Sequence, residues 1–454
     1  MRRLPLRCTY RTLCWLCYFV SKIVSEDSVQ FRLPRGTQDI LPEDQPYWQL
    51  VTSTAQEMAR RFAYDRIDTP VFEQAGLFER GVGEGTDIVE KETYTFPDRS
   101  NEMMTLRAEG TAPVCRAYLE HGMSNMPQPV RMHYFCPIFR YERPQAGRFR
   151  QHNQFGVEAI GDGDPSVDAE VIDLGWRFTE ALGLKGLTLV INSIGDPECR
   201  PKYLETLKAA YKPYLEKVCP DCRMRFERNP LRMLDCKRTD FACQEHIAAA
   251  PQMADYLCDG CADHFAKLQG YLTSLGIPFQ VNSSLVRGLD YYTRTVFEIQ
   301  PPEEGAQSTV LGGGRYDGLI EQLGGRSTPG VGFGSGLERL VLNVKRQSVD
   351  IGENLVGVVD AVVVSMGDAA ASVAVKLASQ LRNSGLRAVL AQPGRSLRGQ
   401  MRHATALGAR YTLVIGDTEV EAGTAQLKDM ATGDQRQVPL EEAASVICKG
   451  SDGI

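Results

Sequence analysis

The sequence predicts an α+β protein: an antiparallel-sheet core with a helical insertion, followed by a separate α/β unit. Three observations predict this architecture. Residues 101–160 alternate strand-like runs with connections too short for crossover helices, which indicates antiparallel pairing. Residues 195–265 are charged, rich in cysteine and without a strand pattern, which is typical of a helical insertion. The last hundred residues alternate strand-like and helix-like runs, which favours a small α/β unit with a largely parallel sheet.

The composition is that of an ordinary globular protein. The chain has 454 residues, of which 43% are hydrophobic and 24% are charged, so we expect two or three domains with a large core. These values exclude the disordered, collagen-like and disulfide-scaffold classes. No run of about 18 apolar residues occurs, so we expect neither a membrane span nor a membrane partner. The net charge of −6 argues against a polybasic nucleic-acid binder but is compatible with a local basic face.

Residues 1–30 form a leader that we expect to be disordered. It contains five basic residues and no acidic residue before Glu26, which fits a transit peptide or an extension from an upstream start codon. The 13 cysteines are an odd number spread along the chain, which indicates thiols in a reducing compartment. We therefore expect a cytoplasmic protein.

The elements of the first part, 31–350, follow from local patterns. The amphipathic run 47–62 predicts a helix. Residues 65–72 predict a strand that Pro70 interrupts, which places it at an edge or an interface. Strands are also expected at 281–299 and 331–335, with a helix from about Gly336 and a polar linker at 347–353.

The second part, 355–454, has the clearest alternation. Strands are predicted at 361–365, 386–390 and 411–415, and helices at 369–384 and 396–408. The segment 376–410 contains seven basic residues and no acidic one, although the whole chain is acidic. It predicts a face that contacts nucleic-acid phosphates, and a solvated helix face is the alternative.

The glycine-rich runs do not encode the common nucleotide-binding loops. No Gly-Lys pair occurs, so the chain has no Walker A loop. Neither 81–85 nor 330–336 spaces its glycines as G-x-G-x-x-G. If ATP binds, another architecture must hold it.

Residues 139–150 predict a strand and a basic loop, with a second strand after them. An arginine in a sheet can hold a phosphate through two hydrogen bonds, and the loop, which includes Arg148, could close over a triphosphate. Gln154 and Glu158 are evenly spaced, so they share one face of the second strand. Taken alone, the segment is equally compatible with a solvated hairpin.

Three other segments combine arginine with acids, tyrosines or glycines. Residues 282–293 place an arginine, an acid and two tyrosines in an apolar strand and turn. Residues 311–318 predict a glycine turn with Arg315 and Asp317, and 332–339 predict a small-residue strand that runs into a helix.

With these segments together, the chain resembles the histidyl-tRNA synthetases, a family of class II aminoacyl-tRNA synthetases, from about Phe31 to its end. The segments that match family motifs are Ile67–Phe72 (the dimer-forming motif 1), Arg140 with Glu142 (motif 2), Gly332–Arg339 (motif 3), and 287–292 and 312–317 (signatures of the histidyl enzymes). The resemblance implies a class II catalytic domain over 31–350, with its insertion at about 195–265, and an anticodon-binding domain over 355–454.

The resemblance also implies an activity, its partners and its residues. The activity is ATP-dependent ligation of L-histidine to tRNA(His) through a histidyl-adenylate, by a homodimer that uses Mg²⁺. The implied catalytic residues are Arg140 and Arg287. The residues implied to bind ATP are Arg140, Glu142, Arg148, His152 and Arg339, with His152 in place of an aromatic residue that stacks on adenine. The residues implied to bind histidine are Glu109, Gly110, Thr111, Arg140, Gln154, Glu158, Arg287, Tyr291 and Tyr292.

A second function stays open at this point. Synthetase-like chains also occur as non-catalytic regulatory subunits and as sensors of uncharged tRNA. Such chains typically lose catalytic arginines or the anticodon domain, or gain a kinase. This chain keeps Arg140, Arg287 and Arg339 and has no kinase segment, which favours the enzyme.

Two C-x-x-C pairs suggest a metal site in the insertion. Cys219 with Cys222 and Cys258 with Cys261 have the turn residues that suit tetrahedral zinc ligation. The 35 residues between the pairs exceed the usual gap of about 15 to 20. Zinc held by these four thiols is one expectation, and reduced thiols without a metal are the other.

Overall fold

The computed structural model describes residues 31–82, 92–142, 148–302, 309–352 and 357–451. The leader, 1–30, lies outside them. The chain divides into two compact units, Met1–Val349 and Asp350–Ile454. Among the helices that are described, none is long and apolar enough to cross a membrane.

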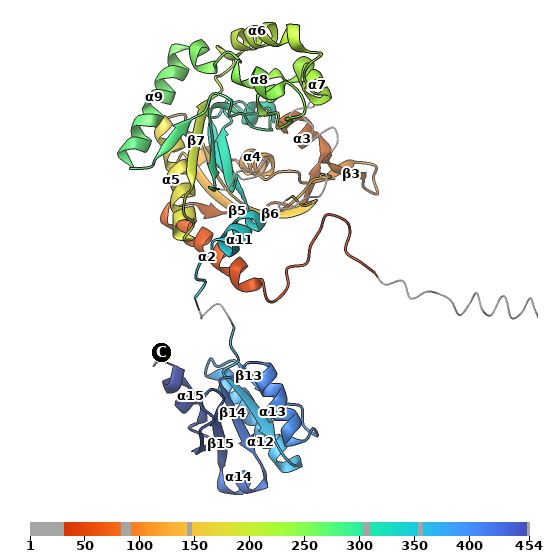
Figure 1. The fold of residues 1–454 in the computed structure, drawn as a ribbon, viewed down its shortest axis with the longest axis vertical. Helices are drawn as coiled ribbons and strands as arrows, with labels where there is room; N and C mark the ends of the chain where they lie inside the picture. The colour runs from red at the N-terminus through yellow and green to blue at the C-terminus, as the bar shows by residue number, and fades with distance from the viewer. Residues whose placement is uncertain (1–30, 83–91, 143–147, 303–308, 353–356, 452–454) are drawn as a thin grey trace, which may run out of the picture. The chain divides into compact units, whose positions relative to one another are not determined.

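Within the described part of the first unit, eight strands form a central sheet. Across the sheet they are β1 (Asp65–Arg66), β5 (Val130–Phe139), β6 (Gln151–Ile160), β11 (Gly330–Gly336), β10 (Leu311–Arg315), β9 (Thr293–Gln300), β7 (Thr188–Ser193) and β8 (Phe279–Val281). The six inner strands, β5 to β7, pair antiparallel, and the short edge strands β1 and β8 run parallel to their neighbours. The predicted antiparallel core is confirmed (Figure 1).

Three strand predictions need correction. Residues 65–72 do not form one strand, because β1 ends at Arg66 and β2 (Phe72–Gln74) lies in another sheet. Pro70 lies between them, and proline has no N–H to donate to a ladder. The expected strand 281–299 is also not continuous, because β8 ends at Val281 and β9 begins at Thr293. The expected glycine turn 311–318 is instead the inner strand β10 over its first five residues.

A smaller sheet and an unpredicted helix lie beside the central sheet. The smaller sheet has the order β2, β4 (Met103–Leu106), β3 (Tyr94–Pro97). Helix α4 (Thr111–Glu120) falls inside 101–160, where only strands and turns were expected. The Glu109 carboxylate starts this helix, since it accepts hydrogen bonds from the amides of Thr111 and Ala112, both at 2.7 Å. Two short helices pack near α4, namely α3 (Ala75–Val82) and α10 (Leu319–Gln322).

Helices cover the face of the central sheet that carries aromatic side chains. The Phe178 ring of α5 (Pro165–Ala181) meets the Phe155 ring of β6 at 5.3 Å between centroids, and Phe155 meets Phe333 of β11 at 5.8 Å. Helix α2 (Gln45–Arg61) packs against α5 and α11 (Leu337–Arg346). These two helices confirm the predictions at 47–62 and from about Gly336. The opposite face of β6 and β11 is thereby left for polar side chains.

The insertion is helical and without a strand over 195–265, as predicted. Its helices are α6 (Arg200–Tyr211), α7 (Pro220–Arg228), α8 (Cys243–Ala248) and α9 (Asp259–Ser274), with 3₁₀ turns that include η4 (Pro230–Asp235). They gather on one side of the first unit (Figure 1). Buried Asp168 of α5 ties the insertion to the sheet, because it contacts His264 of α9 at 3.2 Å and pairs with Arg315 of β10.

The second unit has a mixed five-stranded sheet in its described residues. The order is β13 (Ala388–Leu390), β12 (Ala361–Ser365), β14 (Tyr411–Ile415), β15 (Thr424–Asp429), β16 (Gln435–Pro439). The three predicted strands are parallel, whereas β15 and β16 are antiparallel additions that the sequence did not suggest. The helices are α12 (Asp368–Asn383), α13 (Leu397–Ala406), α14 (Asp417–Ala422) and α15 (Ala443–Ser451), of which the first two were predicted.

Candidate active site

Glycines keep one face of the central sheet bare. Gly312 and Gly314 of β10 pair with Gly334 and Gly332 of β11, so all four face the same side. A Cβ atom at Gly312 would lie 2.7 Å from the guanidinium nitrogens of Arg287. Cβ atoms at Gly332 and Gly334 would overlap the side chains of Glu158 and Gln154. The glycines of β10 therefore leave room for polar side chains above the strand. This is why the glycines occur in a strand and not in a turn.

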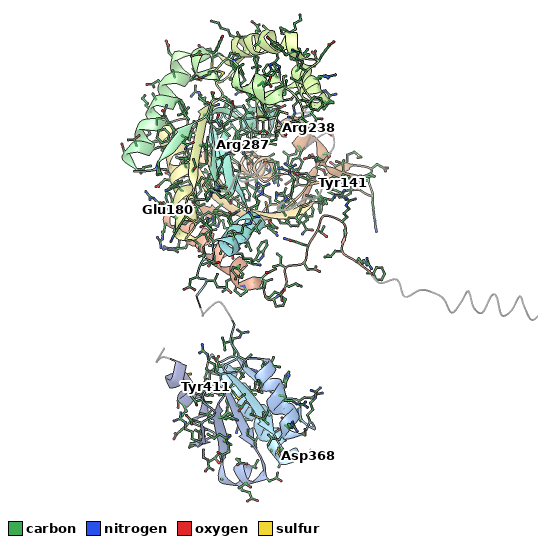
Figure 2. The ribbon with its side chains drawn as sticks, viewed as in Figure 1. Tyr141, Glu180, Arg238, Arg287, Asp368 and Tyr411 are labelled. Atoms are coloured by element: carbon green, nitrogen blue, oxygen red, sulfur yellow. The ribbon has the colours of Figure 1, made fainter. Side chains whose placement is uncertain are left out.

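Arg287 lies over this glycine floor, in the loop between β8 and β9 (Figure 2). Its guanidinium forms an ion pair with Glu298 of β9. The Glu298 carboxylate also accepts hydrogen bonds from Thr309 at 2.7 Å and Gln300 at 2.9 Å. Because Glu298 is opposite Gly312 in the sheet, this carboxylate fixes Arg287 directly above the floor.

Glu158 is the centre of a buried polar cluster on the same face. The side chain is fully buried and lies opposite Gly332 in the ladder. It accepts hydrogen bonds from the hydroxyls of Thr111 at 2.8 Å, Tyr134 at 3.1 Å and Tyr316 at 2.6 Å. Burial raises the pKa of Glu158 to about 8. When this group is ionised, above that pKa, it has about four acceptor positions, and the three hydroxyls leave one of them for a ligand N–H.

A second buried carboxylate, Glu109, lies beside this cluster. Burial raises its pKa, although the two amides that it caps oppose that shift. The Tyr291 hydroxyl is 3.4 Å from Glu109, and the Tyr291 ring meets Tyr292 at 4.7 Å and Tyr316 at 5.9 Å between centroids. A Cβ at Gly110 would overlap the Tyr134 ring. The structure thus brings together Glu109, Gly110, Thr111, Glu158, Tyr291 and Tyr292 in one buried cluster with tyrosine rings on its border.

The motif 2 residues lie just after β5. Arg140 donates to the Ala108 carbonyl at 2.7 Å, and its Nη1 is 3.9 Å from Glu142. Arg148 contacts the other oxygen of Glu142 at 2.6 Å. Glu142 therefore lies between two guanidinium groups. The remainder of the predicted basic loop, 143–147, is outside the described residues.

The pKa values of Arg339 and His152 show that this region is positively charged. Burial lowers the pKa of Arg339, and the nearby guanidinium groups of Arg148, Arg140 and Arg287 lower it further, while Glu142 opposes them. Burial and the charges of Arg140 and Arg339 lower the pKa of His152 to about 3, so its imidazole is neutral. Four arginines from three separate segments thus share one field, which suits a ligand with several negative charges.

Three residues of the site had no role in the sequence analysis: Tyr134, Glu298 and Tyr316. Tyr316 lies within the recognised segment 312–317, so the signal for it was present. Nothing local marks Tyr134 or Glu298, because their roles depend on which strands are neighbours. Arg315, by contrast, lies on the opposite face of β10 and is fully buried against Asp168 and Asp317. It ties the sheet to α5 and is not part of the site.

The predicted zinc set is not brought together. Among the described residues, Cys219 and Cys222 group with Cys236 and Cys243, whereas Cys258 and Cys261 group with Asp196 and Cys199. The two C-x-x-C pairs therefore belong to separate clusters. The physical reason is that α7 and α9 each begin with one pair, and each helix start packs against a different part of the insertion.

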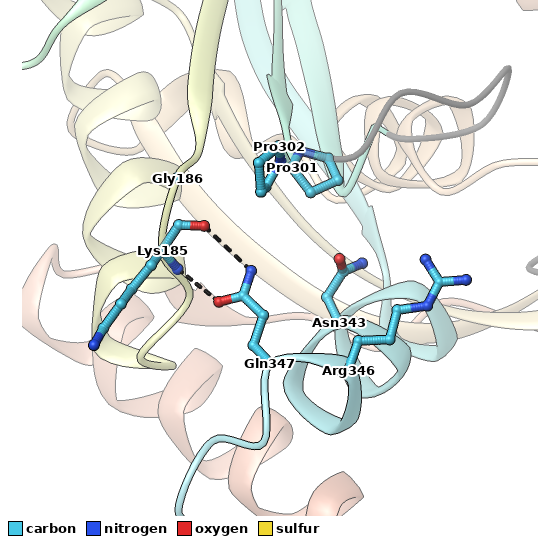
Figure 3. A pocket seen from close by; sticks show the side chains of 7 residues that line it. All are labelled: Lys185, Gly186, Pro301, Pro302, Asn343, Arg346 and Gln347. Atoms are coloured by element: carbon cyan, nitrogen blue, oxygen red, sulfur yellow. Dashed lines mark hydrogen bonds between the residues drawn. The ribbon is translucent and has the colours of Figure 1, made fainter.

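A separate pocket of about 320 Å³ lies away from these residues (Figure 3). Its lining residues are Lys185, Gly186, Pro301, Pro302, Asn343, Arg346 and Gln347. Gln347 exchanges two hydrogen bonds with the backbone of Lys185, at 2.9 and 3.2 Å, which fastens the end of α11 to the loop before β7. The pocket contains none of the predicted site residues.

Comparisons with known proteins agree on one family. A family model described as histidyl-tRNA synthetase matches residues 36–209 and 228–340, and a model described as anticodon binding domain matches residues 360–449. A histidine–tRNA ligase of Dehalococcoides mccartyi is 52% identical over 419 residues, which cover 92% of this chain and 99% of that relative. One of Moorella thermoacetica is 50% identical and covers 90% of this chain and 95% of that relative.

Solved structures give the same result. The apo histidyl-tRNA synthetase of S. aureus is 39% identical, with a TM-score of 0.77, and the match covers 92% of this chain and all of that one. A histidyl-tRNA synthetase of Nostoc sp. PCC 7120, at 21% identity and a TM-score of 0.64, shares the fold. With two family models and relatives of about half-identical sequence over most of its length, the chain belongs to the histidyl-tRNA synthetase family.

Proposed function

We propose that this chain ligates L-histidine to tRNA(His), using ATP, through a histidyl-adenylate. The observation that carries the proposal is the shared glycine floor, over which Arg287 and Glu158 face the same space. One ligand can therefore meet a cationic group at one end and a buried carboxylate at the other. Histidine has that distribution, with a carboxylate at one end and imidazole N–H groups at the other.

The first step is activation of the amino acid. A carboxylate oxygen of histidine attacks the α-phosphorus of ATP, the bond to the bridging oxygen breaks and pyrophosphate leaves. The protein mainly aligns the two anions and stabilises charge. We assign Arg140 and Arg287 to the carboxylate and the α-phosphate, and Arg148 and Arg339 to the outer phosphates, because the charges of all four act on the same region. Mg²⁺ would be bound by oxygens of the outer phosphates.

We assign the adenine contacts to Glu142 and His152. The neutral His152 imidazole can stack on a base without adding a further positive charge to the site. In the second step, a terminal ribose hydroxyl of the tRNA attacks the acyl carbon and AMP leaves.

The buried cluster with tyrosine rings on its border would select histidine. Glu109, Thr111 and Gln154 are assigned to the α-ammonium group, and Glu158 and Tyr292 to the imidazole nitrogens. An amino acid without these nitrogens would leave Glu158 buried with an unfilled acceptor position, and such mismatches reduce kcat/KM by about 10⁴-fold or more. The site therefore needs no editing domain.

The decisive test is ATP–pyrophosphate exchange with each amino acid in turn, followed by aminoacylation of tRNA(His). Exchange should depend on histidine alone. A non-catalytic regulatory subunit would show no exchange with any amino acid, and nothing in the site favours that alternative.

The compartment that we propose is the cytoplasm. The ten cysteines within the described residues are free thiols, which supports it.

We further propose that the second unit binds the anticodon of tRNA(His) through the turn between β13 and α13. Arg395 is exposed in this turn, and Arg398 is exposed in the first turn of α13. Buried Gln400 donates to the carbonyls of Ser365 at 2.8 Å and Arg395 at 2.9 Å, which fastens the turn to the end of β12. The turn can therefore present its arginines in a fixed arrangement to an RNA loop.

Replacing Arg395 or Arg398 with alanine should weaken tRNA binding and reduce its salt slope by up to about one unit each. Filter binding over a salt series measures both quantities, and pyrophosphate exchange should not change because it needs no tRNA. Arg436→Ala is the matched control, since it removes an equal, exposed charge outside 376–410. If both variants behave like this control, the basic segment is solvated surface.

A homodimer is the assembly that we propose, with the small sheet at its interface. Phe72, Phe96, Met104 and Leu106 share one face of that sheet, where Phe72 is 52% and Phe96 40% exposed. Apolar side chains in such a patch mark protein interfaces. Buried Arg107, next to Leu106 of the patch, donates to the carbonyls of Thr69, before β2, and of Pro137 in β5, both at 2.8 Å, and so ties the small sheet to the central one.

Phe72→Asp should convert the dimer to a monomer and also lower histidine-dependent exchange. Light scattering after gel filtration measures the mass at a micromolar concentration. Met366→Asp is the control, because Met366 is 47% exposed but lies in the second unit. A monomeric parent protein, or a Phe72→Asp variant that stays dimeric, would remove this interface.

A further inference from the structure

Four buried thiols meet in the insertion, apart from the catalytic face. They belong to Cys219, Cys222, Cys236 and Cys243, which all lie within the described residues and are free. Their sulfur atoms are all within 4.8 Å of one another. The Cys219–Cys236 sulfur distance is 3.7 Å and the Cys222–Cys243 distance is 3.9 Å. The cluster thus offers four soft ligands around one point.

These separations are those of a tetrahedral metal site. A zinc–thiolate bond is about 2.3 Å long, so the sulfur atoms of a regular tetrahedron lie about 3.8 Å apart. A disulfide would require a sulfur–sulfur distance of about 2.05 Å. The four sulfur atoms are therefore spaced for a shared ion and not for pairwise oxidation.

Backbone amides point at two of the four sulfur atoms, those of Cys219 and Cys243. Cys219 is the N-cap of α7, and its sulfur accepts from the Cys222 amide at 3.4 Å. The Cys219 amide donates to the Cys243 sulfur at 3.3 Å. Amide donors and a helix N-terminus stabilise negative charge on sulfur, and only the thiolate is a metal ligand.

We propose that the insertion binds one Zn²⁺ through Cys219, Cys222, Cys236 and Cys243. Four protein ligands leave no open position, so the site is structural and not catalytic. The segment it closes is a set of short helices and turns, α7, η4 and α8, and metal ligation would hold these short elements together. The site is independent of the histidine and ATP sites proposed above.

The proposed site would also support the catalytic loop. Turn η4 lies between Cys222 and Cys236 in the chain. Arg232 of η4 donates to the Gly288 carbonyl at 3.0 Å, and Asn229, just before η4, bonds to the Asp290 carboxylate. The two acceptors, Gly288 and Asp290, closely follow Arg287 in the chain. A metal that orders η4 therefore helps to hold Arg287 in position.

The neighbouring cluster of Asp196, Cys199, Cys258 and Cys261 serves as an internal control. The Asp196 carboxylate is already engaged, since Arg294 donates to it at 3.2 Å and the Glu198 amide at 3.0 Å. The oxygens of this carboxylate are therefore satisfied without a metal. Replacing Cys258 should leave the proposed zinc site intact.

The test measures metal content in the full chain, purified without chelator, by elemental analysis. We expect about one zinc per chain in the parent protein. Cys222→Ser and Cys236→Ser should each lose that equivalent, and Cys258→Ser should keep it. Since a cysteine variant can fail to fold, the parent protein is also stripped with chelator and titrated with Co²⁺. The visible absorption of tetrahedral cobalt–thiolate should then appear and saturate at one equivalent.

Several results would overturn the proposal. They are metal far below one equivalent together with no cobalt–thiolate absorption, iron in place of zinc, disulfides between these cysteines, or loss of the metal only on Cys258→Ser. The proposed support of the Arg287 loop by η4 is tested separately, through activity. Protein stripped of zinc, freed of chelator and assayed with excess Mg²⁺ should show histidine-dependent exchange at least tenfold below that of the parent protein, and added Zn²⁺ should restore it. Unchanged exchange after proven zinc loss would show that the site does not support Arg287.

Discussion

Replacing Arg287 with alanine should abolish adenylate formation and leave the fold intact. Arg287 is the guanidinium that lies directly over Gly312, and Glu298 holds it there. Preorganised charge at a developing transition state contributes about 3 kcal/mol or more, so histidine-dependent exchange should fall by at least about 100-fold. Pre-steady-state measurement of pyrophosphate release would place the loss in the chemical step.

The conservative variant separates charge from geometry. Arg287→Lys keeps the positive charge but loses the planar fork that can meet Glu298 and a phosphate together, so it should recover only part of the activity. Glu298→Gln should act through Arg287 and lower kcat more than it raises the KM for ATP. Exchange near the parent rate in Arg287→Ala would show that Arg287 is not catalytic.

Replacing Glu158 with glutamine should weaken histidine binding far more than ATP binding. The carboxylate accepts from three hydroxyls and keeps one position for the ligand. A glutamine at this position would turn its NH₂ group, which only donates, toward hydroxyls or a ligand N–H that also donate. At about pH 8.5, where most of Glu158 is ionised, a hydrogen bond to this charged group contributes about 1.5–3 kcal/mol, which corresponds to a rise of roughly 10- to 150-fold in the KM for histidine.

Two controls accompany Glu158→Gln. Tyr316→Phe removes one of three hydroxyl donors to Glu158 and keeps the carboxyl group itself, so it should have the smaller effect. The KM for ATP, measured in the same exchange assay, should stay within about twofold. Equal losses for both ligands would mean that the histidine site is misassigned.

The same substitution has a consequence for stability. Burial raises the pKa of Glu158 from its usual 4.5 to about 8, so the folded chain keeps a proton that the unfolded chain releases. The stability of the parent protein therefore falls as the pH rises from about 4.5 to about 8. Glutamine cannot ionise, so the free energy of unfolding of Glu158→Gln should rise relative to that of the parent by a few kcal/mol between about pH 5 and about pH 8.5. Urea unfolding at these two pH values measures the difference. A constant difference between the two proteins would contradict the buried, protonated carboxyl.

Local patterns were enough to predict many elements. The helix at 47–62, the helix after Gly336 and the parallel strands 361–365 and 411–415 follow from hydrophobic periodicity, which depends only on neighbouring residues. The strand at 311–315 was mistaken for a turn because glycine ordinarily marks turns. In this sheet the glycines instead leave space for Arg287 and for ligands, which depends on what lies above the strand.

The sequence by itself determined the antiparallel core, the helical insertion, the α/β unit and the recognisable arginine and tyrosine segments. Only the tertiary structure decided which side chains meet. Tyr316 reaches Glu158 across 158 residues of chain, and Arg315, its neighbour, points to the opposite face because successive strand residues alternate. Likewise, Cys219 and Cys222 meet Cys236 and Cys243 and not the second C-x-x-C pair. Such contacts follow from strand register and helix packing between distant segments, which the spacing of residues along the chain does not specify.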